Sequence, residues 1–387
     1  MRVAIVHDWL TGMRGGERCL EVFCELFPDA DLFTLLHNRG SVSARIEDMR
    51  IHTSFVPSLP GAAQFYRYYL PLFPLAVEQF DLRRYDLVLS SSHCAAKGVR
   101  TAPHQLHLCY CYTPMRYVWD MAHTYFSKEV LGFFSRKLIP PVLNYLRVWD
   151  VFSSQRVDSF IAISQHIAAR IAKHYRRTAD VIYPPVEVGR FRHNSAGDYY
   201  LLVSAFAPYK RIDLVLDAFR ELALPLRVIG EGQERRRLLR HAGPTVKFLG
   251  RLSDDEVAEQ MAHCKAFVFA AEEDFGIAPL EAQAAGKPVI AYGRGGVTET
   301  IKGLTLTGDD ERDADELKRG KHHGLFFARQ DAASLAHAVR FYEKHADAFS
   351  AERIQANVAG FDRERFKQEI ARAIERQVAA FGHGECR

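Results

Sequence analysis

The feature that most constrains this chain is the alternation of short apolar runs with longer helical patterns along most of its length. Helical patterns follow several of the runs, at 16–27, 211–222, 254–264 and 279–286. Such alternation predicts parallel sheets in an α/β architecture. The apolar runs, which we expect to be strands, lie at 3–7, 32–36, 86–92, 106–112, 159–164, 200–206, 226–230, 246–250, 266–271 and 288–293.

A break in this alternation divides the chain nearly in half. Residues 184–198 mix Pro, Gly and polar residues without periodicity, and 387 residues are too many for one ordinary domain. We therefore expect two Rossmann-like domains, 1–190 and 191–365, that face each other across a cleft, and a helix at 366–387 that packs back toward the first domain. In open α/β sheets, ligands bind at the carboxyl ends of the strands, so functional residues should directly follow strands.

Composition excludes several classes of function. A net charge of +4 is too small for a dedicated nucleic-acid binder, and the longest apolar runs are far shorter than the ~20 residues that span a bilayer. His7 and Asp8 interrupt the first apolar run, so we expect no signal peptide. The seven cysteines include no CxxC pair, which indicates reduced thiols in a cytoplasmic protein; Cys109 and Cys111 are expected as buried apolar residues rather than metal ligands.

The most informative segment is 272–282, directly after an apolar run. Gly276 permits close backbone approach, and Pro279 suits the first turn of a helix, where its missing N–H is not needed. Backbone N–H groups at this helix start would bind a phosphate, with Glu273 and Glu281 on either side to accept hydrogen bonds from sugar hydroxyls. The alternative is that the acids only complement the helix dipole, which explains the acidic run but not Glu281.

Two adjacent cations, Lys210 and Arg211, follow the run at 200–206 and open a helix. A cation is unfavourable at a helix N-terminus, so an external anion such as a pyrophosphate would offset the cost. Two solvated surface cations are the alternative.

A glycine-rich turn follows the first apolar run. Gly12, Gly15 and Gly16 lead into a helix, where backbone N–H groups and the helix dipole favour an anion. The pattern is not GxGxxG, and a simple turn is the alternative.

Together these segments resemble a known enzyme family. The second half carries PYKRIDL, VIGEGQE, FLGRLSDDEV, EEDFGIAPLEAQAAGKPVIAYGRGGVTE and GLFF in that order. It resembles the family 4 retaining glycosyltransferases of the GT-B fold. The first half, with HDWLTGMRGGE, DLVLSSSHCAAKGV and CYTPMRYVWD, resembles the bacterial branch that builds surface polysaccharides, many members of which are mannosyltransferases.

The resemblance implies roles for residues that follow strands. Glu273 would contact the donor sugar hydroxyls and Glu281 the ribose hydroxyls, while Lys210 would neutralise the pyrophosphate with Arg211 as a second cation. Backbone N–H groups for the sugar and the distal phosphate would come from Phe275, Gly276 and Ile277. In the Gly15–Gly16 turn, Gly16 would close over the donor phosphate. Four residues would border the nucleotide base: Gly230, Glu231, Arg251 and Leu252.

Two positions depart from the family pattern. Many relatives have Arg five residues before the Lys, where this chain has Ala205, and many have a His at the end of the fifth strand, where this chain has Tyr112. His93, at the end of the preceding strand, is the expected substitute near the sugar. A purely structural histidine is the alternative.

The loop 113–120 and the residue before it are the expected acceptor site, through Tyr112, Arg116 and Asp120. Aromatic and charged groups in one loop suit recognition of a sugar or a lipid phosphate. Packing of the loop aromatics is the alternative.

Aromatic and basic residues also gather at 65–74, 83–85 and 133–141. They would form a surface that contacts an anionic membrane, at the inner face of the plasma membrane. Core or interdomain packing is the alternative.

We therefore expect transfer of a sugar from a nucleotide diphosphate donor to a saccharide or lipid-linked saccharide, with retention at the anomeric carbon. GDP-mannose is the preferred donor on the resemblance alone. No cofactor or metal is expected, because the helix start and a cation would neutralise the diphosphate. The alternatives are a nucleotide-sugar epimerase of the same fold and a non-catalytic protein that binds nucleotide sugars or polysaccharide.

Overall fold

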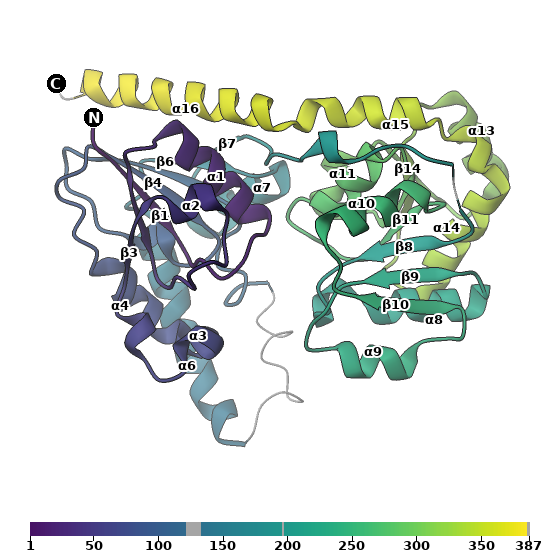
Figure 1. Ribbon diagram of the computed structural model, residues 1–387, viewed down its shortest axis with the longest axis horizontal. Helices are drawn as coiled ribbons and strands as arrows, with labels where there is room; N and C mark the ends of the chain where they lie inside the picture. The colour runs from purple at the N-terminus through teal and green to yellow at the C-terminus, as the bar shows by residue number, and fades with distance from the viewer. Residues whose placement is uncertain (121–132, 196, 385–387) are drawn as a thin grey trace. The chain divides into compact units, whose positions relative to one another are not determined.

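The computed structural model describes residues 1–120, 133–195 and 197–384, which form two compact units. One unit contains Met1–Pro185 together with Glu364–Arg387, and the other contains Val186–Arg363. The sequence placed these boundaries slightly later, after residues 190 and 365. Each unit is built on one seven-stranded parallel sheet with helices on its faces (Figure 1). Both units are therefore Rossmann-like.

The sheet of the first unit has the strand order β3-β2-β1-β4-β5-β6-β7. In the register of β1 and β4, His7 lies opposite Ser91, and in that of β4 and β5, Ser92 lies opposite Cys111. The residues that follow these three strands therefore emerge at the same edge of the sheet. The strands are β1 (Val3–His7), β2 (Asp31–Thr34), β3 (Arg50–Thr53), β4 (Leu87–Ser92), β5 (Leu106–Cys111), β6 (Ser159–Ala162) and β7 (Ala179–Val181).

Helices of the first unit begin at recognisable caps. The Glu17 carboxylate accepts the Arg14 N–H (3.0 Å) at the start of α1, and the Ser164 hydroxyl accepts the Ile167 N–H (3.1 Å) at the start of α7. The helices are α1 (Gly15–Leu26), α2 (Ala44–Glu47), α3 (Ala62–Phe65), α4 (Phe73–Glu78), α6 (Phe133–Ser154), α7 (Gln165–Tyr175) and α16 (Arg363–Gly384), with short 3₁₀ turns η1 (Val56–Ser58), η2 (Tyr66–Leu72) and η3 (Ala96–Gly98).

The C-terminal helix α16 packs on α1 and β5 of the first unit. The ring of Phe366 lies 6.0 Å from that of Phe23 and 5.6 Å from that of Tyr110, and Lys367 pairs with Glu25 at 2.9 Å. This apolar contact explains why the end of the chain belongs to the first unit although the second unit precedes it in sequence.

The sheet of the second unit has the order β10-β9-β8-β11-β12-β14-β13. The strands are β8 (Tyr200–Val203), β9 (Leu226–Ile229), β10 (Val246–Gly250), β11 (Phe267–Phe269), β12 (Val289–Tyr292), β13 (Gly303–Thr305) and β14 (Gly324–Phe327). The helices are α8 (Ile212–Leu222), α9 (Arg235–His241), α10 (Asp254–His263), α11 (Ile277–Ala284), α12 (Val297–Thr300), α13 (Asp310–Arg319), α14 (Ala332–His345) and α15 (Ala351–Val358), with 3₁₀ turns η4 (Val188–Arg190), η5 (Pro208–Lys210), η6 (Ala346–Ala348) and η7 (Ala359–Phe361).

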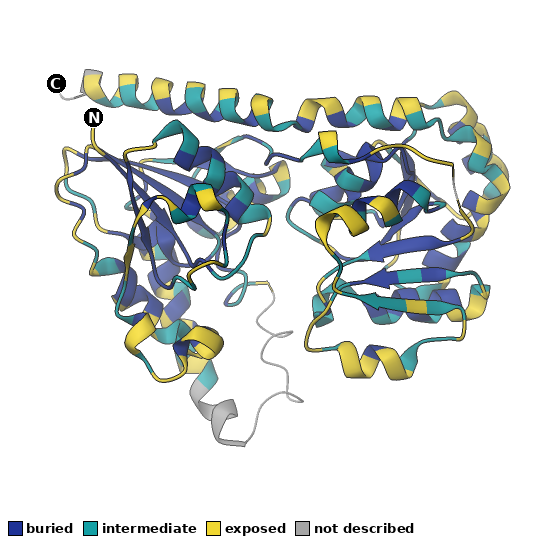
Figure 2. Cartoon of the chain, in the orientation of Figure 1, coloured by how far each residue is buried: buried dark blue, intermediate teal, exposed yellow. Residues whose placement is uncertain are grey.

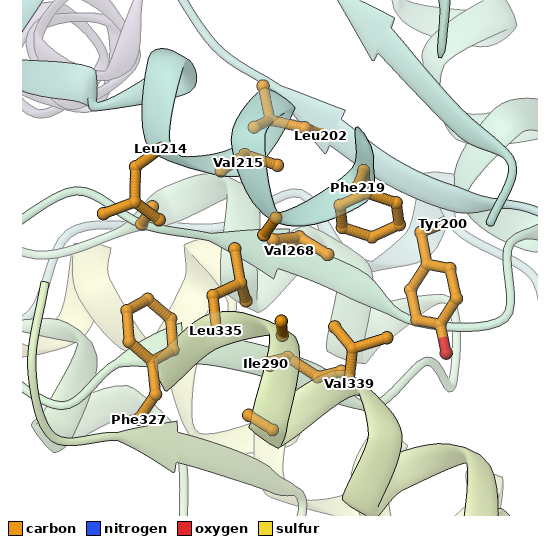
Figure 3. Packing of buried hydrophobic residues seen from close by; sticks show 14 of the residues in the cluster. Tyr200, Leu202, Leu214, Val215, Phe219, Val268, Ile290, Phe327, Leu335 and Val339 are labelled. Carbon is orange, nitrogen blue, oxygen red and sulfur yellow. The ribbon is translucent and has the colours of Figure 1, made fainter. Parts of the chain in front are cut away.

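The core of the second unit lies between its sheet and the helices α8 and α14. Val215 and Phe219 of α8 and Leu335 and Val339 of α14 are fully buried and point toward Val268 of β11 (Figure 3). The central strands are buried while the helices carry alternating buried and exposed residues (Figure 2). This pattern is the reason that the apolar periodicity predicted these elements.

Each apolar run that we expected as a strand overlaps an observed strand, whereas β3, β7, β13 and β14 were missed. β3 (RIHT) is polar and mostly exposed at the edge of its sheet, and β7 and β13 are three residues long. β14 (GLFF) is buried but has only four residues. Edge and very short strands carry no continuous apolar signal.

No helix in the described part of the chain is both long and apolar enough to cross a membrane.

Candidate functional site

In the second unit, the loop after β8 meets the loop after β11 through an ion pair. Lys210 Nζ contacts Glu273 Oε1, and the two side chains are 14% and 20% exposed. Lys210 also lies over the ring of Tyr209, with 5.2 Å from Nζ to the centroid. The structure therefore brings together the predicted phosphate cation and the predicted sugar-binding carboxylate, and the two charges neutralise each other.

The start of α11 follows this pair directly. Gly276 precedes the helix with a φ of +94°, a left-handed conformation that glycine adopts without strain. Phe275 is buried, with its ring 6.0 Å from that of Phe361, so its side chain anchors the loop in the core. The N–H groups of the first turn have no partner within the helix and can bind an anion, and Glu281 lies further along the same helix.

Two glycines that we assigned no role, Gly295 and Gly296, hold this loop in place. The Gly296 N–H donates to the Glu273 carbonyl at 2.8 Å, and a Cβ on Gly296 would lie 2.4 Å from the Asp274 carbonyl oxygen. Any side chain at 296 would therefore displace the backbone of the loop 273–275. The signal was present as the GRGG that follows β12, but only the packing shows its purpose.

The four residues expected at the nucleotide base come from two adjacent loops. Gly230 and Glu231 follow β9, and Arg251 and Leu252 follow β10. The Gly230 N–H donates to the Gly250 carbonyl at 2.9 Å, and the Phe206 N–H donates to the Glu231 carbonyl at 2.9 Å. The structure thus places both loops beside the segment that precedes Lys210.

The Arg211 side chain has other partners than Lys210 has. Its φ of +51° places its side chain against Asp213 (Nε to Oδ1, 3.4 Å) and Gln330 (Nη1 to Oε1, 3.2 Å). Asp213 in the first turn of α8 therefore offsets this cation at the helix start, and Arg211 requires no external anion. The argument for a bound anion now rests on Lys210.

In the first unit, the sequence prediction missed Asp8, the residue that follows β1. Its carboxylate is fully buried and accepts the four consecutive backbone N–H groups of residues 93–96 at 2.6–3.0 Å. Its Oδ2 also lies 3.0 Å from Nδ1 of His93. Burial acts to raise the pKa of Asp8, but the charge and hydrogen bond of His93, together with the charge of His7, outweigh it and lower this pKa.

His93 follows β4 and remains partly accessible, with its side chain 26% exposed. The edge of its ring meets the ring of Trp9, with 4.4 Å between the centroids. The structure thus holds His93 at the carboxyl edge of the sheet, between Asp8 and Trp9.

A chain of hydrogen bonds crosses the same edge through Tyr112. The Tyr112 hydroxyl donates to the Gly16 carbonyl (2.9 Å), so its oxygen accepts from Ser91 (2.9 Å), whose oxygen in turn accepts from Nδ1 of His7 (3.0 Å). Burial raises the pKa of Tyr112 well above its usual value. Tyr112 therefore connects β5 to the Gly15–Gly16 turn at the start of α1.

The loop after Tyr112 is tied to α6 and α7. Asp120 pairs with Arg170 and lies 3.6 Å from Nε2 of His174; the hydrogen bond to His174, with the charge of Arg170, lowers the pKa of Asp120 to about 2 despite some burial. Trp119 stacks on His174 and donates from Nε1 to Asp150 Oδ2 at 2.8 Å. Arg116, the third expected acceptor residue, is half-buried in this loop.

The two sheets and the loops at their carboxyl edges define a protein of two Rossmann-like domains. Each domain has polar groups at the carboxyl ends of its parallel strands. A likeness over nearly the whole chain supports this class. The structure of Anabaena HepE in complex with UDP covers 97% of this chain and 100% of that chain, with a TM-score of 0.69 and 17% sequence identity. The fold is therefore that of the GT-B glycosyltransferases.

Residues 188–359 match the family described as glycosyl transferases group 1. The O-antigen chain mannosyltransferase C of Escherichia coli is 29% identical over 136 residues, which are 33% of this chain and 37% of that protein. A GDP-mannose-dependent monoacylated alpha-(1-6)-phosphatidylinositol monomannoside mannosyltransferase of Corynebacterium glutamicum is 35% identical over 133 residues, 30% of this chain and 35% of that protein. The matched stretches span less than half the length of the curated relatives.

Proposed function

We propose that this protein is a retaining hexosyltransferase that moves a sugar from a nucleotide diphosphate donor to a hydroxyl of a saccharide or lipid-linked saccharide. The observation that carries the proposal is the pairing of Lys210 with Glu273 beside the start of α11, in the domain that matches the glycosyltransferase family. Transfer requires stabilisation of the departing diphosphate, and a cation beside preorganised N–H groups supplies it.

Each residue of this site has a part in the proposed reaction. Lys210 and the N–H groups of Gly276 and Ile277 bind the diphosphate, Glu273 accepts hydrogen bonds from the sugar hydroxyls, and Glu281 accepts them from the ribose. The leaving phosphate helps to deprotonate the acceptor on the same face of the sugar, which gives retention without an enzyme nucleophile. In the proposal, Lys210 and the N–H groups at the start of α11 neutralise the diphosphate, so no metal is included.

We propose GDP-mannose as the donor and surface polysaccharide as the product. The C. glutamicum relative is named as GDP-mannose-dependent and the E. coli relative as an O-antigen chain mannosyltransferase. Because the HepE structure contains UDP, a UDP-sugar is the alternative donor to compare with GDP-mannose. The names of these two relatives support mannose in the proposal.

A lipid-linked acceptor would bring the protein to the inner face of the plasma membrane. On the first unit, Phe65, Tyr68 and Leu75 are 54%, 82% and 53% exposed, and Arg67 lies among them. Apolar and aromatic side chains beside a cation suit an anionic lipid interface. Of the expected patch at 133–141, the side chains of 133–138 lie outside the described part of the chain.

The test is incubation of the full chain with GDP-mannose or UDP-glucose, with and without a lipid-linked saccharide acceptor. Sugar transfer that requires the acceptor supports the proposal. Donor turnover without acceptor would indicate the epimerase, and nucleotide-sugar binding without turnover would indicate a binding protein. Lys210→Ala should abolish most of the transfer while the circular dichroism spectrum stays unchanged.

A further inference from the structure

The carboxylate of Asp8 makes more hydrogen bonds than the cap of a turn requires. Oδ1 accepts the N–H groups of Ala95 (2.6 Å) and Ala96 (2.8 Å), and Oδ2 accepts those of His93 (2.7 Å) and Cys94 (3.0 Å). These four bonds already satisfy the turn that follows β4. The fifth contact, from Oδ2 to Nδ1 of His93 at 3.0 Å, reaches the imidazole itself.

This fifth contact determines which nitrogen of His93 carries the proton. An ionised carboxylate can only accept, so Nδ1 of His93 must be the donor. In the neutral ring the other nitrogen, Nε2, then holds the lone pair. Trp9, whose ring meets the His93 ring edge-on, fixes the plane of the imidazole. Because the side chain is 26% exposed, part of this ring can be reached from solvent.

We propose that Asp8 is the positioning residue of His93 and fixes the tautomer in which Nε2 accepts a hydrogen bond from a saccharide hydroxyl at the carboxyl edge of the first sheet. This inference rests on the proposed function, because the hydroxyl belongs to a sugar of the transfer reaction. Asp8 acts only through His93, since its own oxygens are fully buried and occupied. The same carboxylate holds the backbone N–H of His93 and determines which ring nitrogen is protonated, so the backbone position and the tautomer are coupled.

The first test is spectroscopic and needs no activity. The full chain is labelled with ¹⁵N-histidine, and the signal of His93 among the 17 histidines is assigned by its loss in His93→Gln. We expect the chemical shifts of an Nδ1-protonated ring at a pH where the imidazole is neutral. A ring protonated on Nε2 would overturn the proposal even if the enzyme is active.

The second test is a double-mutant cycle on kcat/KM with Asp8→Asn and His93→Ala. If Asp8 acts through His93, Asp8→Asn should reduce kcat/KM about tenfold or more in the native background and less than about twofold in the His93→Ala background. A purely structural Asp8 would give equal losses in both backgrounds, which would overturn the proposal. Thermal melting of Asp8→Asn in both backgrounds checks that the substitution lowers Tm equally in the two.

The two tests separate the inference from the function on which it rests. If Asp8→Asn does not fold, the tautomer in the unmodified protein still decides the proposal. If no pair of donor and acceptor gives transfer, the proposed function is wrong. Independently of that result, a His93 ring protonated on Nε2 would show that Asp8 does not fix the proposed tautomer.

Discussion

The carboxylate of Glu273 competes with a diphosphate for the charge of Lys210. Both side chains are mostly buried, so neither is fully solvated when the pair separates. Glu273→Gln removes the competing charge and keeps the shape of the side chain. We therefore expect this variant to bind a nucleoside diphosphate more tightly than the native protein, although it should transfer sugar more slowly because the proposed function also assigns the sugar hydroxyls to Glu273.

The size of the effect follows from the strength of the bond that is lost. A hydrogen bond between charged groups contributes about 1.5–3 kcal/mol, and 1.4 kcal/mol changes Kd about tenfold. Partial exposure and the weaker bond that Gln can still offer to Lys210 reduce this contribution. We expect Kd for GDP or UDP to fall about three- to tenfold in Glu273→Gln.

The neighbouring Glu272 provides a matched control. Glu272 is exposed in the same loop, so Glu272→Gln removes the same charge one residue away while the Lys210–Glu273 pair remains. Isothermal titration of GDP and UDP into both variants measures the difference. Equal affinity gains in the two variants would show a general effect of charge and refute the ion-pair reasoning, as would weaker binding by Glu273→Gln.

Three further perturbations test the two units separately. Gly296→Ala would place a Cβ 2.4 Å from the Asp274 carbonyl, so nucleotide affinity measured by titration should fall about tenfold, whereas Gly360→Ala, with open space around it, should not change it. Lys97→Ala leaves the buried Asp150 without its partner at 2.6 Å, and urea unfolding should show a loss of about 3–5 kcal/mol. Burial lowers the pKa of His107 to about 4, so below about pH 6.5 the unfolded chain binds a proton that the folded protein does not bind. The free energy of unfolding should therefore fall by up to about 3 kcal/mol as the pH decreases from 6.5 toward 4. In denaturant titrations, His107→Gln should reduce this dependence on pH.

Sequence periodicity predicted the sheets because their central strands are apolar on both faces, but it could not predict contacts between separate loops. Glu273, Gly276 and Lys210 could be predicted as site residues because each lies in a segment that follows a strand, and the rule that ligands bind at these ends needs no coordinates. Asp8 was missed although it obeys the same rule. Its partners lie at 93–96, and the parallel register of β1 and β4 that joins them is visible only in the fold.

Arg211 illustrates a second limit of the sequence. The sequence predicts Lys210 as the phosphate cation with Arg211 as a second candidate, and it does not show what either side chain contacts. Their backbone conformations differ, and the left-handed φ of Arg211 turns its side chain toward Asp213. A one-residue change in backbone conformation therefore decides which cation reaches Glu273, and no spacing in the sequence records it.

The carboxyl edges of the two sheets are stabilised in different ways, and this difference assigns their tasks. In the first unit, Asp8 is buried and makes its bonds to backbone groups, which a ligand could replace only by unfolding the turn at 93–96. In the second unit, the charged ends of the Lys210 and Glu273 side chains pair with each other, and a diphosphate and a sugar hydroxyl can replace both partners without moving a backbone bond. The first edge is suited to holding a group such as His93 in one orientation, whereas the second can exchange an internal partner for a charged substrate. In the proposed reaction, a donor that arrives and leaves in every turnover therefore belongs at the second edge.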